Sequence, residues 1–357
     1  MKPNFLSNLT GNPVYQRNRS YLLLLLSALL GLSGCATLPV SDHFDGSRFY
    51  NPASDSSEHG FADHVKWMWE MKTVDWPEWI QDTPQPAPPA RVGTGQLRIT
   101  YINQATLLIQ TDSLNILTDP IFSDFAGPVS FLASKRIRNP GIPFDSLPSI
   151  DIVLVSHNHY DHFDLPTLVR IGKRDRPVLI TGLGNKDLID TTLFSKVYET
   201  DWWQDVETET GRMKITFVPA LHQSGRGLFD ENESVWGGFV LESSFGRVYF
   251  AGDTGYGQFV QPLHQRFPDF RLTILPIGSY EKRWIMKSQH MNPDDAVRLH
   301  LFLQSKQSIG MHFATFLEHP EQNVDQHEKD LEAALKTYKV DRDQFLILKF
   351  GEGVVFH

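Results

Sequence analysis

The chain has 357 residues, a formal net charge of -9 at pH 7, 41% hydrophobic and 12% aromatic residues, and a single cysteine. This composition excludes a disordered or fibrous chain, since such chains are poor in apolar and aromatic residues. The acidic balance argues against nucleic acid as a partner, because duplex binding needs Lys and Arg to neutralise phosphates. One cysteine excludes an internal disulfide and a zinc site built on cysteine pairs.

The N-terminal segment has the order of charged and apolar residues that is typical of an export signal. Lys2, Arg17 and Arg19 precede an apolar run over residues 21–30, and no acidic residue occurs before it. A run of this length is too short to span a bilayer as a stop-transfer helix, which needs about 20 residues. We therefore predict that the segment is removed during export.

The residues Leu32-Ser-Gly-Cys35 follow this run and resemble the lipobox of bacterial lipoproteins, in which the cysteine is acylated and becomes the first residue after cleavage. We predict a signal peptide over 1–34, lipidation of Cys35 and a mature net charge of -12. By the same resemblance, Ala36 after the cysteine favours the outer membrane. The expected location is the bacterial cell envelope, anchored by lipid and facing the periplasm. A signal-anchor helix with an incidental cysteine is the alternative.

Two segments precede the main domain. Residues 35–63 are polar and turn-rich, and we predict a tether. Residues 64–96 combine a tryptophan cluster with a Pro-rich linker. The indoles pack onto the main domain in one interpretation and contact a membrane or an acyl chain in the other, since tryptophan has both an apolar body and a polar group. The tryptophans are Trp67, Trp69, Trp76 and Trp79.

From residue 97 onward, short β-rich runs alternate with helical segments, which predicts a layered α/β domain over 97–357. The predicted strands are 97–102, 106–110, 116–120, 152–155, 178–181, 214–218, 239–242, 248–251, 272–277 and 345–349. Asn292-Pro293-Asp294-Asp295 has the N-cap residue, the early proline and the acids that open a helix, predicted over 296–303. A second amphipathic helix is predicted over 328–338.

Four metal-ligating side chains fall within six residues directly after the strand 152–155. They are His157, His159, Asp161 and His162. A single histidine is more often packed or solvated, but this spacing lets the first two side chains bind one ion while the last two turn to a second. Imidazole and carboxylate without thiolate suit zinc, with manganese or iron as alternatives.

This His-x-His-x-Asp-His motif resembles the signature of the metallo-β-lactamase superfamily. The resemblance implies an αββα four-layer sandwich and three further ligands, which are His222 in Val218-Pro-Ala-Leu-His222, Asp253 in Phe250-Ala-Gly-Asp253 and His312 in Gly310-Met-His312. By the family pattern, one zinc ion takes His157, His159 and His222. The other takes Asp161, His162 and His312, and Asp253 bridges the two.

Further stretches resemble N-acylphosphatidylethanolamine-hydrolysing phospholipase D and its bacterial lipoprotein relatives. They are Thr118-Asp-Pro-Ile-Phe-Ser123, Trp236-Gly-Gly-Phe239, Pro276-Ile-Gly-Ser-Tyr280 and Met286-Lys-Ser-Gln-His290. The resemblance implies a phosphodiesterase that hydrolyses a phospholipid by attack of a hydroxide bridging two metal ions. It also implies a possible homodimer. Asn103-Gln104-Ala105 departs from the pattern, since relatives commonly carry Gly-His-Ala there.

The resemblance also assigns roles around the metals. Asp253 and Asp161 are catalytic, and His290 contacts the substrate phosphate and takes part in catalysis. Tyr160 and Arg226 are candidate substrate contacts, with packing and a surface charge as their alternatives. Asp119 either orients a ligating imidazole or simply forms a turn before proline.

Two other functions remain open at this point. One is hydrolysis of a small phosphorylated or lactone substrate. The other is a metal-binding protein of the envelope without catalysis. Seven ligands for two metals disfavour the second, because a purely structural zinc site closes its coordination with four protein ligands. β-Lactam hydrolysis is disfavoured because no cysteine is available as a ligand.

Overall fold

The computed structural model describes residues 40–51, 63, 66, 69–70, 74–129, 133–208, 211–227, 229–243, 246–317 and 322–356. The predicted signal peptide, Cys35 and Trp67 lie outside the described residues. Within the described part of the chain, no helix is long and apolar enough to cross a bilayer.

The first of two seven-stranded sheets has the order β16-β1-β2-β3-β6-β7-β8. Its members are β1 (Leu97–Asn103), β2 (Thr106–Thr111), β3 (Leu114–Thr118), β6 (Ile152–Val155), β7 (Val178–Gly182), β8 (Lys196–Thr200) and β16 (Gly353–Phe356). The strands from β16 to β3 are antiparallel, and those from β3 to β8 are parallel. Strands β2 and β6 are buried along their whole length, as expected for strands covered on both faces.

The second sheet has the order β15-β14-β13-β12-β11-β10-β9. Its members are β9 (Asp205–Glu207), β10 (Lys214–Val218), β11 (Gly238–Ser243), β12 (Gly246–Phe250), β13 (Phe270–Pro276), β14 (Ser305–Met311) and β15 (Phe345–Leu346). It is antiparallel from β9 to β12 and parallel from β12 to β15, so it repeats the plan of the first sheet. A small separate hairpin joins β4 (Phe125–Ala126) to β5 (Ser134–Lys135).

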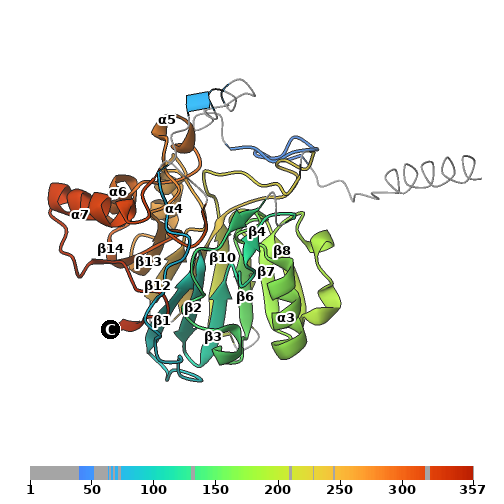
Figure 1. Cartoon of the computed structure of the whole chain (residues 1–357). Coiled ribbons are helices and arrows are strands. Elements are labelled where there is room, and N and C mark those ends of the chain that lie inside the picture. The colour runs from blue at the N-terminus through green and yellow to red at the C-terminus, as the bar shows by residue number, and fades with distance from the viewer. Residues whose placement is uncertain are drawn as a thin grey trace, which may run out of the picture. The chain divides into compact units, whose positions relative to one another are not determined.

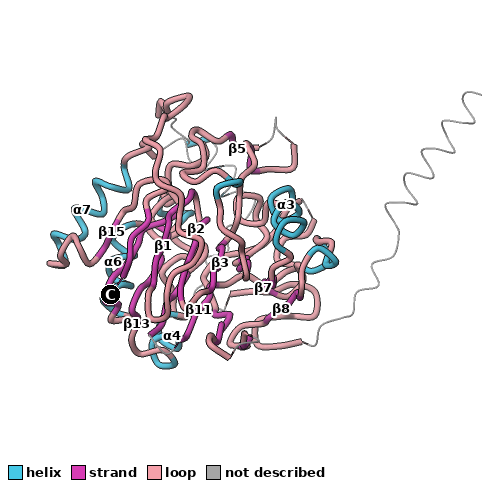
Figure 2. The backbone as a smooth tube through the Cα atoms, turned by 90° about the horizontal axis from the view of Figure 1, so that it is seen from below, coloured by secondary structure: helices cyan, strands magenta, loops and turns pink. Residues whose placement is uncertain are grey.

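Helices cover the outer faces of the two sheets (Figure 1 and Figure 2). The helix α3 (Leu165–Asp175) packs its buried Leu168 and Ile171 into the core cluster of the first sheet. On the other side lie α4 (Val260–Arg266), α5 (Arg283–Met286), α6 (Pro293–Phe302) and α7 (Gln326–Tyr338), with short 3-10 helices η2 (Phe144–Ser146), η3 (Lys186–Leu188) and η4 (Thr191–Leu193) elsewhere. The layers are therefore helix, sheet, sheet and helix, which confirms the predicted αββα sandwich.

The capping chemistry of α6 is as the sequence predicts. The side chain of Asn292 accepts a hydrogen bond from the backbone nitrogen of Asp295, and Pro293 is the first helical residue. The helix α7 begins two residues before its predicted start and ends where predicted. The predicted strand 345–349 is shorter than expected, since only Phe345 and Leu346 pair with β14.

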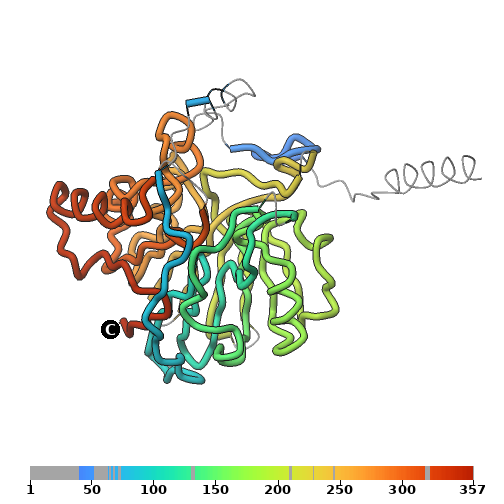
Figure 3. Tube along the Cα trace, in the orientation of Figure 1, coloured from blue at the N-terminus to red at the C-terminus, as the bar shows by residue number. Residues whose placement is uncertain are grey.

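Part of the predicted tether packs on the domain instead. Phe44 and Phe49 are buried, and the ring of His43 stacks on Trp202 with a centroid distance of 4.2 Å. The backbone nitrogen of Phe49 donates to the carbonyl of Asn232, so the segment lies beside the loop between β10 and β11 (Figure 3). The tether prediction is therefore wrong for residues 41–51.

The tryptophans of the entry segment differ from one another. The indole nitrogen of Trp76 donates to the carbonyl of Gln322 at 2.7 Å, so this ring packs on the domain. Trp69 is 90% exposed, and Trp79 is also exposed. The packing interpretation therefore fits Trp76, and a contact with lipid remains a prediction for Trp69.

Candidate metal centre

The seven predicted ligands meet at one edge of the two sheets. Each follows the carboxyl end of a strand: four follow β6, and one each follows β10, β12 and β14. The carboxyl ends of parallel strands lie at the same edge, which is where open α/β sheets build their sites. The structure brings all seven side chains together in two groups of possible ligands.

The loop after β6 holds four of the ligands, and it is fixed by its neighbours. The backbone nitrogens of His162 and Phe163 both donate to the carbonyl of His159, which folds the loop into a tight turn. The side chain of Asn158 donates to the hydroxyl of Ser234 and accepts from the nitrogen of residue 225. These hydrogen bonds stabilise the conformation of the loop.

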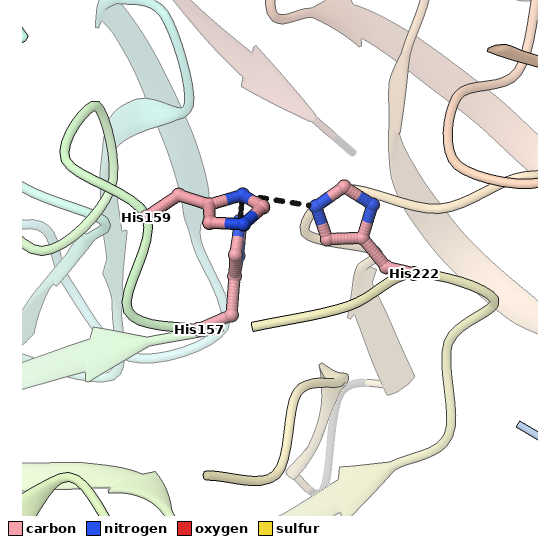
Figure 4. Close-up of side chains that lie close together, drawn as sticks. All are labelled: His157, His159 and His222. Carbon is pink, nitrogen blue, oxygen red and sulfur yellow. Dashed lines mark hydrogen bonds between the residues drawn. The ribbon is translucent and has the colours of Figure 1, made fainter. Parts of the chain in front are cut away.

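The first set consists of three imidazoles whose ring nitrogens converge (Figure 4). Nε2 of His157 lies 2.9 Å from Nδ1 of His159, which lies 3.2 Å from Nε2 of His222. Burial lowers the pKa of His222 to about 3 and holds the pKa of His157 well below its ordinary value. These rings are therefore neutral at physiological pH, which is the form that binds a metal.

The second set, called the tetrahedral set below, consists of four donor atoms that all lie within 4.8 Å of one another. Five of the six distances among them are 3.1–3.2 Å. A regular tetrahedron with such edges would have its centre about 1.9 Å from each corner, close to the ~2.0–2.2 Å of zinc bound to nitrogen or oxygen. The donors are Asp161 Oδ2, His162 Nε2, Asp253 Oδ2 and His312 Nε2.

The charges of this second set also call for a cation. Burial alone would lower the pKa of His162, but Asp161 and Asp253 outweigh it and raise that pKa well above its ordinary value. The pKa of Asp253 is lowered although burial raises it, because His162 and His312 lie against the carboxylate. Buried carboxylates need a positive partner, and a divalent cation supplies one, so the donor set fits a metal.

The other ring nitrogens of the ligands are held by hydrogen bonds that fix their orientation. Nδ1 of His162 lies 2.7 Å from Oδ2 of Asp119, which also accepts from the hydroxyl of Ser156, while Oδ1 of Asp119 accepts from the backbone nitrogen of Ser156. Nδ1 of His222 lies 3.0 Å from the carbonyl of Gln289. Such partners leave Nε2 to face the metal. Asp119 therefore orients an imidazole, which decides between the two roles that the sequence leaves open.

Asp253 lies between the two sets, as a bridging ligand requires. Its Oδ2 belongs to the second set and is 3.8 Å from Nε2 of His222 in the first. Its Oδ1 is buried and has no hydrogen-bond partner among the described residues, which leaves an oxygen open for an ion or for a proton. The preceding Gly252 has a φ of 61°, and a Cβ there would lie 2.7 Å from the Cβ of Ser156. Only glycine allows this approach to the metal loop.

His290 lies beside both sets. Its ring centroid is 5.2 Å from that of His222 and 5.5 Å from that of His312, and its Nδ1 is 3.8 Å from Oδ2 of Asp253. The carbonyl of His290 accepts from Arg283, which holds the residue at the turn before α6. His290 is therefore close to both donor sets, and its contact with substrate stays a prediction.

Arg226 and Tyr160 are placed differently from His290. One guanidinium nitrogen of Arg226 donates to the carbonyls of Asn158 and Phe163 at 2.8 and 2.9 Å, and the guanidinium lies 3.9 Å from the ring centroid of Tyr160. The Tyr160 hydroxyl donates in turn to the carbonyl of Arg226. This geometry fits a clamp on the metal loop better than the predicted contact with substrate.

Two contacts at the site were not predicted from the sequence. The side chain of Gln104 contacts Asp161 and His312 of the second set. The side chain of Asn51, which is distant in sequence, donates to the carbonyl of His222 at 2.8 Å. The departure from the family pattern signalled Gln104, but no local pattern marks Asn51.

A family model described as a beta-lactamase superfamily domain matches residues 114–313. The N-acyl-phosphatidylethanolamine-hydrolyzing phospholipase D 1 of Caenorhabditis elegans is 35% identical over 226 residues, which cover 61% of this chain and 64% of that relative. The mitochondrial N-acyl-phosphatidylethanolamine-hydrolyzing phospholipase D of Saccharomyces cerevisiae is 35% identical over 236 residues, or 64% of this chain and 50% of that relative. The chain thus spans less than two thirds of the length of these relatives.

Solved structures share the fold at low sequence identity. A possible metal-dependent hydrolase from Veillonella parvula has a TM-score of 0.56 at 18% identity and covers 72% of this chain and 99% of its own. The isothiocyanate hydrolase from Delia radicum gut bacteria has a TM-score of 0.56 at 19% identity, covering 72% and 98%. At this identity the likeness supports the sandwich fold alone.

Proposed function

The chain belongs to the beta-lactamase superfamily, and from this premise we propose that it is a di-zinc phosphodiesterase that hydrolyses a phospholipid such as N-acyl phosphatidylethanolamine. The single observation that carries the proposal is the pair of converging donor sets, with Oδ2 of Asp253 in the second set 3.8 Å from Nε2 of His222 in the first. The identity of 35% to phospholipases of this name supports the choice of substrate.

Two zinc ions, when bound, would supply a water of lowered pKa and a positive clamp for phosphate oxygens. The three imidazoles would hold the first ion, and the tetrahedral set would hold the second. Manganese and iron are the alternatives, since imidazole and carboxylate donors bind these metals as well.

The residues of the chain then divide the remaining work of the reaction. His290 binds a phosphate oxygen, since it lies between the two sets. The free Oδ1 of Asp253 accepts the proton of the attacking water. Water attacks phosphorus, the bond from phosphorus to the headgroup oxygen breaks, and that oxygen leaves with a proton. The products are phosphatidic acid and N-acylethanolamine.

We also propose that the enzyme meets its substrate at a membrane to which it is anchored through Cys35, in the bacterial envelope. Exposed Trp69 would then lie close to the lipid surface. Growth with radioactive palmitate tests the anchor. The wild-type chain should carry label that Cys35→Ser lacks, and an unlabelled wild-type chain would contradict it.

The activity itself is tested with the full chain in detergent, loaded with zinc and mixed with vesicles of N-acyl phosphatidylethanolamine. Asp161→Ala should lose the second ion and hydrolysis, because it removes one corner of the tetrahedral set. Bis-p-nitrophenyl phosphate and an acyl lactone serve as competing substrates. Hydrolysis of these alone would favour a small-molecule hydrolase, and bound metal without any hydrolysis would favour a non-catalytic binding protein.

A further inference from the structure

Gln104 occupies a tight turn at the junction of the two sheets. It follows β1 and precedes β2, with a φ of 41°. Its backbone nitrogen donates to the hydroxyl of Thr315 at 2.8 Å, and its carbonyl accepts from the nitrogen of His312 at 2.8 Å. The turn belongs to the first sheet, whereas His312 follows β14 of the second. The backbone of Gln104 thus fastens the metal edge of one sheet to that of the other.

The side chain of Gln104 makes a second connection in the same direction. It is 1% exposed, and its Nε2 donates to Oδ2 of Asp161 at 2.9 Å. The same nitrogen lies 3.0 Å from Nε2 of His312. Asp161 comes from the loop after β6 in the first sheet. One amide group therefore contacts two donor atoms of the tetrahedral set, one from each sheet.

We propose that Gln104 is a positioning residue that sets the affinity of the second metal subsite by holding Asp161 against His312. The inference rests on the two-metal centre of the proposed function. It depends on the chemistry of the amide rather than on any catalytic step, since Gln104 does not act on the substrate in this account.

Asp161 is the member of the tetrahedral set that most needs such support. Its side chain is 17% exposed, whereas those of His162, His312 and Asp253 are at most 3% exposed. Because water reaches the carboxylate of Asp161, this side chain can rotate away from His312, which belongs to the other sheet. The hydrogen bond from Gln104 removes this freedom before the ion arrives, so less free energy is spent on ordering the site.

The amide suits this place because it donates a hydrogen bond without carrying a charge. A lysine or arginine would bind the same oxygen more strongly, but its positive charge would compete with the cation. Glutamine keeps the full negative charge of Asp161 available to the metal.

The test compares two matched substitutions in the same hairpin. Gln104→Asn keeps the amide and tolerates a positive φ well, but it is one methylene too short to reach Asp161. Gln110→Asn makes the same change at a fully buried glutamine on β2, whose Nε2 donates to the carbonyl of Pro89 and to Asn115. The control thus loses buried hydrogen bonds far from the ligands.

Metal-free full chain in detergent is titrated with zinc against a chelator, which yields two stepwise dissociation constants, and with cobalt, whose absorption spectrum reports ligand geometry. The cobalt spectrum assigns each constant to its subsite, and the constant of the second subsite is called the second constant whichever subsite fills first. In Gln104→Asn the second constant should rise about 10–100-fold, which is typical when a partner of a metal ligand is lost. The first constant should not change, and the cobalt spectrum of the second subsite should shift. Gln110→Asn should lower the unfolding temperature and leave both constants unchanged.

Unchanged constants in Gln104→Asn would overturn the inference, as would an equal weakening of both subsites or the same pattern in Gln110→Asn. A wild-type chain that binds fewer than two ions would overturn this inference and the di-zinc proposal together. Two bound ions without hydrolysis of N-acyl phosphatidylethanolamine would overturn only the substrate, and a second constant raised in Gln104→Asn would still support the inference.

Discussion

Replacement of Arg226 by alanine separates a clamp on the metal loop from a contact with substrate. The guanidinium makes two hydrogen bonds to the carbonyls of Asn158 and Phe163 and lies on the ring of Tyr160. Hydrogen bonds from a charged donor contribute about 1.5–3 kcal/mol each, and the contact with the ring adds about 0.5–1 kcal/mol. After discounting for the partial exposure of Arg226, we expect Arg226→Ala to lower the free energy of unfolding by about 3 kcal/mol.

The assay is thermal unfolding of the metal-free chain, together with metal affinity and steady-state kinetics. A loss of about 3 kcal/mol corresponds to roughly 6 °C in a domain of this size. Both zinc dissociation constants should rise, because the clamped loop carries ligands of both sets. Arg226→Lys should recover part of the stability, since it keeps the charge but not the two hydrogen bonds. A normal unfolding temperature and normal metal content, with a KM raised tenfold or more, would refute the clamp and restore the predicted phosphate contact.

Two further substitutions test the surroundings of the site, and a third tests a buried histidine on α6. Asp119→Asn should weaken binding of the second metal about 10–100-fold. In either orientation, the NH2 group of the new amide faces another hydrogen-bond donor, which is Nδ1 of His162 or the backbone nitrogen of Ser156. Chelator competition measures the metal affinity, and wild-type affinity would contradict the prediction. Gly278→Ala should displace the segment that follows β14 and remove the second ion, because a Cβ at position 278 would lie 1.8 Å from the carbonyl oxygen of His312. A variant that still binds both ions would argue against this close approach. Burial lowers the pKa of His300 to about 4, so its stability contribution is present above pH 6.5 and lost as pH falls through 6.5 toward 4. Between pH 7 and pH 5, the free energy of unfolding in urea should therefore fall by about 2 kcal/mol less in His300→Asn than in wild type. Equal losses would refute the lowered pKa of His300.

The strands with strong apolar runs could be predicted from the sequence almost to the residue, because burial on both faces leaves a clear signal. The strand β14 escapes prediction, since Ser305–Met311 begins with polar residues and is placed by pairing with β13 and β15. The strand β16 escapes for a similar reason, as Gly353–Phe356 is only partly buried at the edge of its sheet.

The local part of the site could likewise be predicted from spacing alone, since four ligands fall within one loop. The distant ligands His222, Asp253 and His312 came from the family resemblance, because no local pattern joins strands from two sheets. The structure adds what neither source carries: which ring nitrogens face the ions, and that Gln104 spans the two sheets. It also shows the guanidinium of Arg226 against the carbonyls of Asn158 and Phe163, which the charge of the side chain alone does not predict.

The most direct test of the central claim is the product of hydrolysis by the zinc-loaded full chain acting on N-acyl phosphatidylethanolamine vesicles, followed by mass spectrometry. The account predicts phosphatidic acid and N-acylethanolamine in equal amounts, lost when zinc is removed by a chelator and recovered when two equivalents are returned. A chain that carries two zinc ions and leaves this lipid intact, or that releases a fatty acid instead, would contradict it.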